Sequence, residues 1–525
     1  MYYFYILIFI WFLSAILDYN NFCYYWQLKE YRWDRFKDFL ISKKGQQFSI
    51  LILITILVSL LLMVYFSFFL LEAFYYSYYF LLIFILLVFV LRFFEDEWLH
   101  PKFTKKSLVI VLISLLLEIL LIFVFKVFLI LFIIIPLRIF IISLLILFLK
   151  IPNSFLKKYY SQKAAAKLKQ YPKLKVIGIT GSYGKTTTKE FLAQILDSKF
   201  KVIKTPEHVN TEIGIAKFIL AQDFSEIEVF IVEMGAYKIG EIASICDLVQ
   251  PKMGILTAIN QQHLALFGSQ ENIQQAKYEL LQSLPVDGLA VVNNDNKLCR
   301  EKLSLVKAKV ITYGQKDKFK PQALISAIKT QLDSLEFDLN LENQKFSFFT
   351  KVKGEYNLMN IAPAVLIAIH LGLSEEEIVS GVRKVELKNN YLETYKYGKV
   401  EVINDSYSSN PTGFQAVLKL FEHYPKEKRR IIITRGMIEL GKDSYQLHRE
   451  IGKKIGEQAD ELIIISPDNA SGLIKGVEDF GKKIKVVKIF RPLELVEYLK
   501  KLKEVDSVII LENRMPSIVL KEIKQ

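Results

Sequence analysis

The sequence contains few of the residues that indicate a disulfide framework or a structural metal site. It has three cysteines in 525 residues, Cys23, Cys246 and Cys299, and no two of them form a C-x-x-C pair. This spacing predicts neither disulfide bonds nor a zinc site. It is consistent with a reducing compartment, where free thiols persist.

Acidic residues are outnumbered, with 54 Asp and Glu against 68 Lys and Arg and a net charge of +14. Such an excess can indicate a nucleic-acid partner. Here, however, many of the basic residues follow the last apolar segment, and attraction to anionic lipid headgroups explains them more simply. The sequence therefore predicts membrane lipids, and no nucleic acid, as partners. These lysines are Lys157, Lys158, Lys163, Lys167, Lys169, Lys173 and Lys175.

Long apolar runs are abundant before residue 150 and scarce after it. Five segments approach or exceed the roughly 20 residues that cross a bilayer core, and the first lacks the basic start and the cleavage site of a signal peptide. The sequence predicts a transmembrane helical domain of about five spans over 1–150, followed by a basic linker over 151–175. The five segments are 1–17, 48–71, 74–90, 107–125 and 127–149.

The charges of the loops predict the topology of this helical domain. Basic residues concentrate in 18–47 and 91–106, which places these loops and everything after 150 in the cytoplasm of a multi-pass protein of the inner membrane. Glu118 and Arg138 fall inside predicted spans and could pair across a hairpin. Buried charges also occur in transport pathways, but the spans contain no aligned series of charges. The domain is therefore interpreted first as an anchor or docking platform, with transport as the alternative.

From 176 onward, short β-branched runs alternate with helical stretches, which is typical of parallel sheets covered by helices. One series of runs lies in 176–390 and a second begins near 399, with a break near 385–398. We expect two α/β domains, a central domain with a mainly parallel sheet over 176–390 and a Rossmann-like domain over 391–525. The runs are "KVIGIT", "KVIKT", "EVFIVEM", "MGILTAI" and "LAVVN", then "KVEVIND", "RRIIIT", "ELIIIS", "KIKVVKI" and "DSVIILE".

The first run leads into a glycine-bearing loop and then a helix, an arrangement that binds phosphate groups. The general P-loop form has a glycine six residues before its lysine, where this chain has Ile179. Gly181 and Gly184 would still let backbone N–H groups approach phosphate oxygens. Lys185 would contact the β- and γ-phosphates of a nucleotide. The candidate loop consists of Thr180, Gly181, Ser182, Tyr183, Gly184, Lys185, Thr186 and Thr187.

This T-G-x-x-G-K-T-T form, together with several later stretches of the chain, resembles the Mur ligase family of ATP-dependent amide ligases, and within it the MurF branch. The shared stretches occur in the order of the family. They cover about 176–445 and extend toward the end of the chain. The stretches are "NTEIG" at 210–214, "VEMGAYKIGEIA" at 232–243, "TAINQQHLALFGS" at 257–269, "AKYE" at 276–279, "GEYNLMN" at 354–360, "INDSYSSNP" at 403–411 and "GMIELG" at 436–441.

The resemblance implies a reaction and a set of catalytic residues. Family members use ATP to turn a carboxylate into an acyl phosphate, which an amine then attacks. By resemblance, Thr186 and Glu233 bind Mg²⁺, His263 helps to bind a second metal ion, and Lys277 is the lysine that the family carbamylates. Lys185, Glu233, His263 and Lys277 are therefore the catalytic candidates, and a carbamylated Lys277 would also be a metal ligand.

The resemblance also implies the remaining nucleotide contacts. Asn357 and Asn360 match an element whose first asparagine meets the adenine, although Tyr356 stands where several members have histidine. Asp405, with Tyr407 and Asn410, lies in the first strand–helix turn of the last domain. By resemblance this turn closes over ATP and supports the amine substrate.

Three departures from the family leave the substrates open. Apolar segments stand where typical MurF enzymes have a soluble UDP-binding domain. Tyr391 replaces a usual arginine, and Arg435-Gly436 replaces a common Gly-Asp. The leading interpretation is a membrane-anchored ligase of peptidoglycan precursor synthesis that joins a muramyl-peptide carboxylate to an amino acid or dipeptide, with D-alanyl-D-alanine favoured. The alternatives are a ligase similar to poly-γ-glutamate synthases and a non-catalytic scaffold for other cell-wall enzymes.

Overall fold

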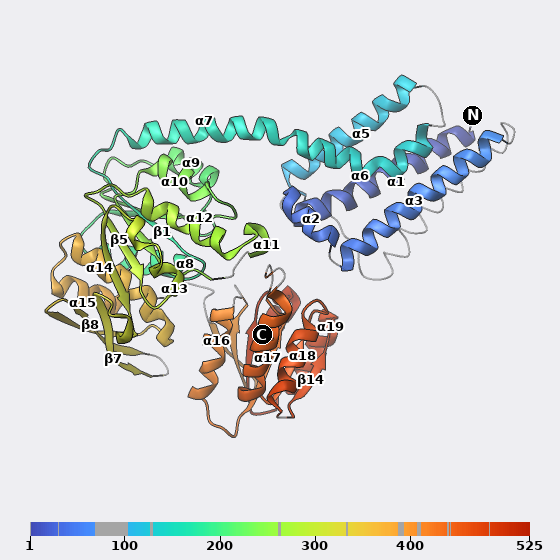
Figure 1. Cartoon of the computed structure of the whole chain (residues 1–525). Helices are drawn as coiled ribbons and strands as arrows, with labels where there is room; N and C mark the ends of the chain where they lie inside the picture. The colour runs from blue at the N-terminus through green and yellow to red at the C-terminus, as the bar shows by residue number, and fades with distance from the viewer. Residues whose placement is uncertain are drawn as a thin grey trace. The chain divides into compact units, whose positions relative to one another are not determined.

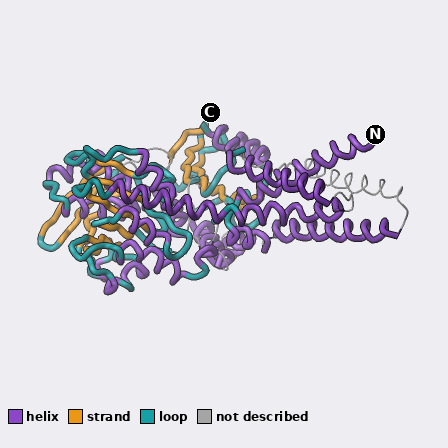
Figure 2. Tube along the Cα trace, turned by 90° about the horizontal axis from the view of Figure 1, so that it is seen from above, coloured by secondary structure: helices purple, strands orange, loops and turns teal. Residues whose placement is uncertain are grey.

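The computed structural model divides the chain into two compact units, 1–158 and 159–525 (Figure 1). Helices form the described part of the first unit, and strands occur in the second (Figure 2). The structure describes 2–524 except for 30, 42, 69–102, 126–129, 261–263, 332–333, 387–392, 407–410, 438–439, 441–442 and 482.

The described part of the first unit is helical, and one of its helices is long and apolar enough to cross a membrane. This stretch, Lys105–Val124, belongs to α5, and shorter apolar stretches occur at Phe48–Leu61 and Leu137–Phe148. Because the described residues contain one such helix, they do not support the predicted five-span bundle, which stays a prediction. The predicted span 74–90 lies outside the described residues. The helices are α1 (Tyr2–Leu28), α2 (Trp33–Ile41), α3 (Lys43–Phe68), α5 (Lys105–Phe125) and α6 (Ile130–Phe148).

The predicted pairing of Glu118 with Arg138 is confirmed. Arg138 on α6 donates to both carboxylate oxygens of Glu118 on α5, at 2.8–3.2 Å, and both side chains are fully buried. Helix α1 joins the pair, because Arg138 also donates to Ser14 and to Asp18, and Trp11 donates to Glu118. The buried charge pair and its hydrogen bonds therefore link side chains of three helices, α1, α5 and α6.

The predicted linker is largely helical. Helix α7 (Lys150–Leu168) covers most of 151–175, and the boundary between the two units falls within it. Its last turns belong to the second unit, where Ala164 and Leu168 are buried in the core of the central domain. The rest of this stretch therefore leads directly into the first strand of the central sheet.

The central domain contains a nine-stranded sheet in the order β2-β3-β1-β4-β5-β6-β7-β8-β9. The strands from β2 to β7 are parallel, and β8 and β9 add an antiparallel extension. The sheet is thus mixed. Strands β1 to β5 coincide with the five β-branched runs. The strands are β1 (Lys175–Thr180), β2 (Val202–Lys204), β3 (Val229–Glu233), β4 (Met253–Leu256), β5 (Leu289–Asn293), β6 (Lys309–Gly314), β7 (Ala323–Thr330), β8 (Leu335–Leu341) and β9 (Gln344–Thr350).

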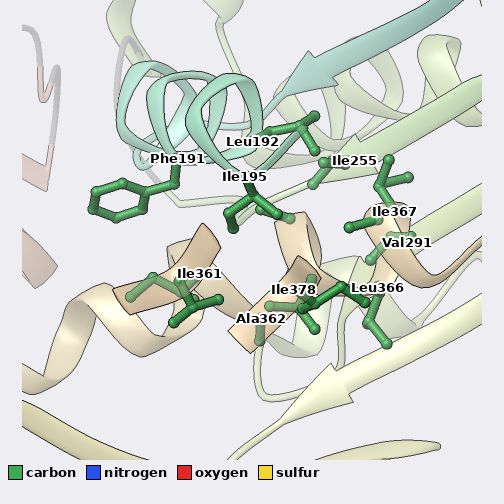
Figure 3. Close-up of a cluster of buried hydrophobic side chains, with 14 of the residues drawn as sticks. Phe191, Leu192, Ile195, Ile255, Val291, Ile361, Ala362, Leu366, Ile367 and Ile378 are labelled. Carbon is green, nitrogen blue, oxygen red and sulfur yellow. The ribbon is translucent and has the colours of Figure 1, made fainter. Parts of the chain in front are cut away.

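Helices cover both faces of this sheet because its strands are apolar on both sides, as expected for buried parallel strands. In β1, Ile177 and Ile179 enter one core while Val176 enters the other. Figure 3 shows the first core, where Phe191 and Leu192 of α8 lie near the α14 side chains. The first face carries α8 (Lys185–Leu196), α14 (Leu358–His370) and α15 (Glu375–Lys384), and the second carries α9 (Glu212–Ala221), α10 (Glu241–Val249) and α12 (Gln270–Gln282).

The last domain is a second α/β layer structure with a six-stranded sheet in the order β10-β11-β15-β12-β13-β14. All its neighbouring strands are parallel except β10 and β11. The strands are β10 (Glu393–Tyr397), β11 (Val400–Asp405), β12 (Arg429–Thr434), β13 (Glu461–Ile464), β14 (Lys485–Lys488) and β15 (Ser507–Glu512). The helices are α16 (Pro411–Leu418), α17 (Ser444–Gln458), α18 (Ala470–Phe480), α19 (Pro492–Leu502) and α20 (Ser517–Ile523).

Candidate active site

The candidate phosphate loop joins β1, which lies inside the central sheet, to the N-terminus of α8. Gly184 has a φ of +80°, which favours glycine, and Gly181 has a φ of +151°. A Cβ added at Gly181 would lie 2.0 Å from Oγ1 of Thr257, and one at Gly184 would lie 2.5 Å from Oδ1 of Asn360. The backbone therefore approaches its neighbours as closely as only glycine permits, and the loop leads into the N-terminus of α8, where backbone N–H groups can bind phosphate.

Lys185, the first residue of α8, lies against this loop. Its Nζ donates to the carbonyl of Gly181 at 2.9 Å. Burial lowers the pKa of Lys185, and the charge of Glu233 opposes that shift. An anionic ligand in the loop would stabilise this partly desolvated ammonium, because opposite charges attract strongly where water is excluded.

Glu233 ends β3 directly beside the loop, since β3 pairs with β1 and places Glu233 opposite Ile179. Its carboxylate is 3% exposed and receives hydrogen bonds from Lys189 at 3.2 Å and from Asn210 at 3.1 Å. Burial alone would raise the pKa of Glu233. The charges of Lys185 and Lys189 nevertheless hold it below its ordinary value, so the group is an anion at neutral pH.

Lys277 lies on α12 and is 4% exposed, with its Nζ 5.9 Å from the centre of the Phe267 ring. Burial, followed by repulsion from Lys185, lowers the pKa of Lys277 to about 7, although Glu241 and Glu279 oppose this shift. A solvated lysine is almost fully charged at neutral pH. The Lys277 amine, in contrast, is available in its neutral, nucleophilic form.

The residues around the loop fit Mg²⁺. Thr186 hydrogen-bonds Glu233 and helps to lower its pKa, so a hydroxyl and a carboxylate oxygen lie together. Mg²⁺ prefers oxygen ligands and takes few of them from the protein when phosphate is present. Among the described residues, no three His, Cys, Asp or Glu side chains form a metal-binding group. His263 lies outside the described residues, so its role as a metal ligand stays a prediction.

Asn357 and Asn360 form a connected pair at the start of α14. Asn357 donates to the carbonyl of Lys353 at 2.7 Å and accepts from Asn360 at 3.1 Å. Asn360 in turn accepts from Thr188 of α8. Both side chains are thereby fixed beside the phosphate loop, with Oδ1 of Asn360 next to Gly184.

Asp405 ends β11 in the last domain, opposite Glu512 at the end of β15. Burial raises the pKa of Asp405 to about 7, so this carboxyl group is a weaker acid than a solvated one. Tyr391, Tyr407 and Asn410 lie outside the described residues.

Sequence reasoning missed three residues of the site. Lys189 and Asn210 both bond Glu233, and Glu279 accepts from the backbone N–H groups of Gly240 and Ala243 at the start of α10. Lys189 follows Lys185 by four residues, and this helical spacing places both on one side of α8. Asn210 begins the "NTEIG" stretch. Only the folded structure shows that Lys189 and Asn210 both contact Glu233.

Fold and site together define an α/β protein with a candidate phosphate-binding loop, in which a second α/β domain follows the loop-bearing one. Comparison with known sequences agrees, because the Mur ligase middle domain matches residues 179–368 and the Mur ligase glutamate ligase domain matches 392–512. The chain belongs to the Mur ligase family through these two domains.

The curated relatives and solved structures that match this chain include enzymes of the MurF branch of the family. The UDP-N-acetylmuramoyl-tripeptide--D-alanyl-D-alanine ligase of Bacillus subtilis (strain 168) is 29% identical over 59% of this chain and 63% of the relative. The enzyme of that name from Synechocystis sp. is 32% identical over 58% of this chain and 65% of the relative. The chain thus spans less than two thirds of the length of these relatives.

Among solved structures, MurF from Acinetobacter baumannii superimposes with a TM-score of 0.63 and 25% identity, over 70% of this chain and 80% of that one. MurF from Thermotoga maritima, solved in complex with ADP, has a TM-score of 0.61 at 23% identity, over 70% of this chain and 83% of that one. The second likeness establishes the fold alone.

Proposed function

We propose that this chain is an ATP-dependent amide ligase of peptidoglycan precursor synthesis, which joins a muramyl-peptide carboxylate to the amine of a dipeptide such as D-alanyl-D-alanine. One observation carries the proposal. Lys185, Glu233 and Lys277 come from three separate segments, yet the charge of Lys185 acts on both Glu233 and Lys277 beside a single candidate phosphate loop. The names of the relatives supply the substrate class.

In the proposed reaction, an oxygen of the acceptor carboxylate attacks the γ-phosphorus of ATP, and the bond from that phosphorus to ADP breaks. The amine then attacks the carbonyl carbon, loses a proton and expels inorganic phosphate. The loop N–H groups and Lys185 hold the phosphates and stabilise the charge of the transferring group. Mg²⁺, held by Thr186 and Glu233 with the predicted help of His263, would neutralise further phosphate charge.

Lys277 would act as a carbamate. Its nitrogen attacks CO₂ in the neutral form and loses a proton, which gives a carbamate anion in place of a buried cation. The repulsion from Lys185 then becomes an attraction, and the new oxygens add metal ligands. Burial of Lys277 beside Lys185 supports this role, because the positive form is disfavoured there.

The nucleotide base and the amine substrate have proposed positions too. Asn357, braced by Asn360, would contact the adenine with its remaining hydrogen-bonding capacity. Asp405 would support the amine substrate. It lies at the first turn of the last domain, at the edge where doubly wound sheets bind ligands.

We further propose that 1–150 anchors the enzyme in the inner membrane with the ligase domains, 176–390 and 391–525, in the cytoplasm. The apolar stretch of α5 and the buried Arg138 pair support an anchor. The lysines of 151–175 would contact anionic lipids, and other cell-wall enzymes would be further partners.

Phosphate release from ATP by detergent-solubilised protein tests the ligase proposal. The acceptors would be UDP-muramyl tripeptide and its lipid-linked counterpart, each with D-alanyl-D-alanine or single amino acids. Release should require an acceptor and an amine together, and Lys185→Ala should abolish it while the protein stays folded. Release that occurs with a γ-glutamyl acceptor and an amine, but with neither muramyl acceptor, would favour the poly-γ-glutamate alternative. No release with any pair, from protein that binds ATP, would favour the scaffold.

A further inference from the structure

Helix α8 carries two lysines that have different partners, although their spacing places them on one side of the helix. Lys185 donates to the carbonyl of Gly181, in the candidate phosphate loop, at 2.9 Å. Lys189, four residues later, donates instead to Oε2 of Glu233 at 3.2 Å. Lys185 therefore belongs to the loop, whereas Lys189 contacts the carboxylate that is the proposed Mg²⁺ ligand.

Lys189 is enclosed by the protein. Its side chain has an exposed fraction of 0%, and a lysine is almost never this buried unless it is paired. Two carboxylates lie near its ammonium group, Glu233 at 3.2 Å and Glu190 at 3.9 Å. Glu190 is itself paired with Lys204 at the end of β2. Glu233 is therefore the main counter-ion of Lys189.

The carboxylate of Glu233 is held in place on more than one side. Its backbone N–H donates to Oγ1 of Thr205 at 3.0 Å, and its Oε1 accepts from Asn210 at 3.1 Å. Asn210 is fixed in turn, because its carbonyl accepts from the N–H of Gly235 at 2.8 Å. Glu233 would have to break these contacts to turn away from Lys189. A metal ion on Glu233 must therefore bind close to the Lys189 ammonium group.

This part of the site is unfavourable for a free divalent cation. Lys185 and Lys189 are the cations that act on Glu233, and together they hold the pKa of this carboxyl group below its ordinary value despite its burial. The negative charge of Glu233 is thus already compensated before any ligand binds. Repulsion between cations is strong where water is excluded. The phosphates of a nucleotide would bring the negative charge that a metal ion needs here.

We propose that Lys189 makes Mg²⁺ binding depend on the nucleotide. Lys189 neutralises Glu233 in the free enzyme and repels a free divalent ion, so that Mg²⁺ binds firmly only together with phosphate. The inference rests on the proposed nucleotide and Mg²⁺ site, and is independent of which acceptor and amine the enzyme joins. Lys189 is a positioning residue, because it acts through Glu233.

Metal binding in the absence of nucleotide tests this inference. Solubilised full-length protein would be titrated with Mn²⁺, which accepts the same oxygen ligands as Mg²⁺ and whose free form is measured by electron paramagnetic resonance. The wild type should bind Mn²⁺ at least about tenfold more tightly with ADP than without it. Without nucleotide, Lys189→Met should bind Mn²⁺ at least about tenfold more tightly than the wild type, because one cation beside the metal ion is removed.

Further variants separate the charge of Lys189 from its shape. Lys189→Gln is neutral but keeps an N–H donor, and it should gain affinity for Mn²⁺ as Lys189→Met does. Lys189→Arg keeps the charge and should not. Lys201→Met is the matched control, since Lys201 forms an exposed pair with Glu226 at 2.7 Å in the same domain, and it should behave as the wild type. Adding Glu233→Gln to Lys189→Met should abolish the gain, which would locate the gained site at Glu233.

Unchanged or weaker Mn²⁺ binding by folded Lys189→Met and Lys189→Gln would overturn the inference, because a lysine with a purely structural role gives no gain in affinity when it is replaced. Melting temperatures show whether each variant is folded. Wild-type protein that binds Mn²⁺ equally well with and without ADP would also overturn it, and this measurement needs no variant. Failure of the ligase proposal has a different signature, namely no phosphate release with any substrate pair from protein whose Mn²⁺ binding still depends on ADP.

Discussion

Replacing Lys277 by methionine removes a buried ammonium but keeps the length of the side chain. In the folded chain the pKa of Lys277 is lowered from 10.5 to about 7, and each unit corresponds to about 1.4 kcal/mol. Between these two values the unfolded chain binds a proton that the folded chain does not, so stability rises with pH. The wild type should therefore gain up to about 5 kcal/mol relative to Lys277→Met as the pH rises from 7 to 10.5.

Thermal melting of the solubilised protein in CO₂-free buffer measures this difference. For a domain of this size, about 5 kcal/mol corresponds to a relative shift on the order of 10 °C, with Lys277→Met the more stable variant at pH 7. Lys252→Met, at an exposed position of the same domain, should follow the wild type at every pH. Parallel melting curves for the wild type and Lys277→Met from pH 7 to 10 would refute the reasoning, because they would show that Lys277 is solvated.

Bicarbonate extends the same experiment to the carbamate. Added ¹³C-bicarbonate should give the wild type a carbamate carbon resonance that Lys277→Met lacks, and it should stabilise the wild type alone. Lys277→Ala should lose ligase activity, and short carboxylic acids should restore part of it. Full activity of Lys277→Ala would exclude the carbamate.

Three further outcomes are expected. Gly184→Ala should lose at least tenfold in ATP affinity, since its Cβ would lie 2.5 Å from Asn360 in a backbone conformation of φ +80°, and unchanged ATP titrations would contradict the loop assignment. Arg138→Met should destabilise the helical unit by about 3–5 kcal/mol because it leaves Glu118 without its cation, whereas adding Glu118→Met should restore most of that loss; equal unfolding of single and double variants would show that the pair is not coupled. Removal of 1–150 should leave a soluble protein that binds ATP, and an insoluble, unfolded fragment would refute the boundary.

The strands of the parallel core could be predicted because their side chains enter apolar cores on both faces, which produces uninterrupted β-branched runs. The antiparallel extension was missed. In β8 buried residues alternate with half-buried ones, as in "LEFDLNL", and in β9 buried residues alternate with exposed ones. This weaker pattern escapes a search for continuous runs. Strand β10 escapes the same search for a similar reason, since "ETYKY" is only partly buried. It lies within 385–398, where the sequence predicts a break between domains.

The sequence by itself determined the order of the functional features along the chain. Apolar segments come first, then a candidate phosphate loop, then the family motifs that contain Glu233 and Lys277. These are local patterns, which involve residues close together in the chain and can therefore be recognised in the sequence. Tertiary structure alone decided that Lys189 and Asn210 bond Glu233 and that Lys277 is buried beside Lys185. Burial and charge pairing depend on residues far apart in the chain, so the shifted pKa values of Glu233 and Lys277 arise only when the central domain folds.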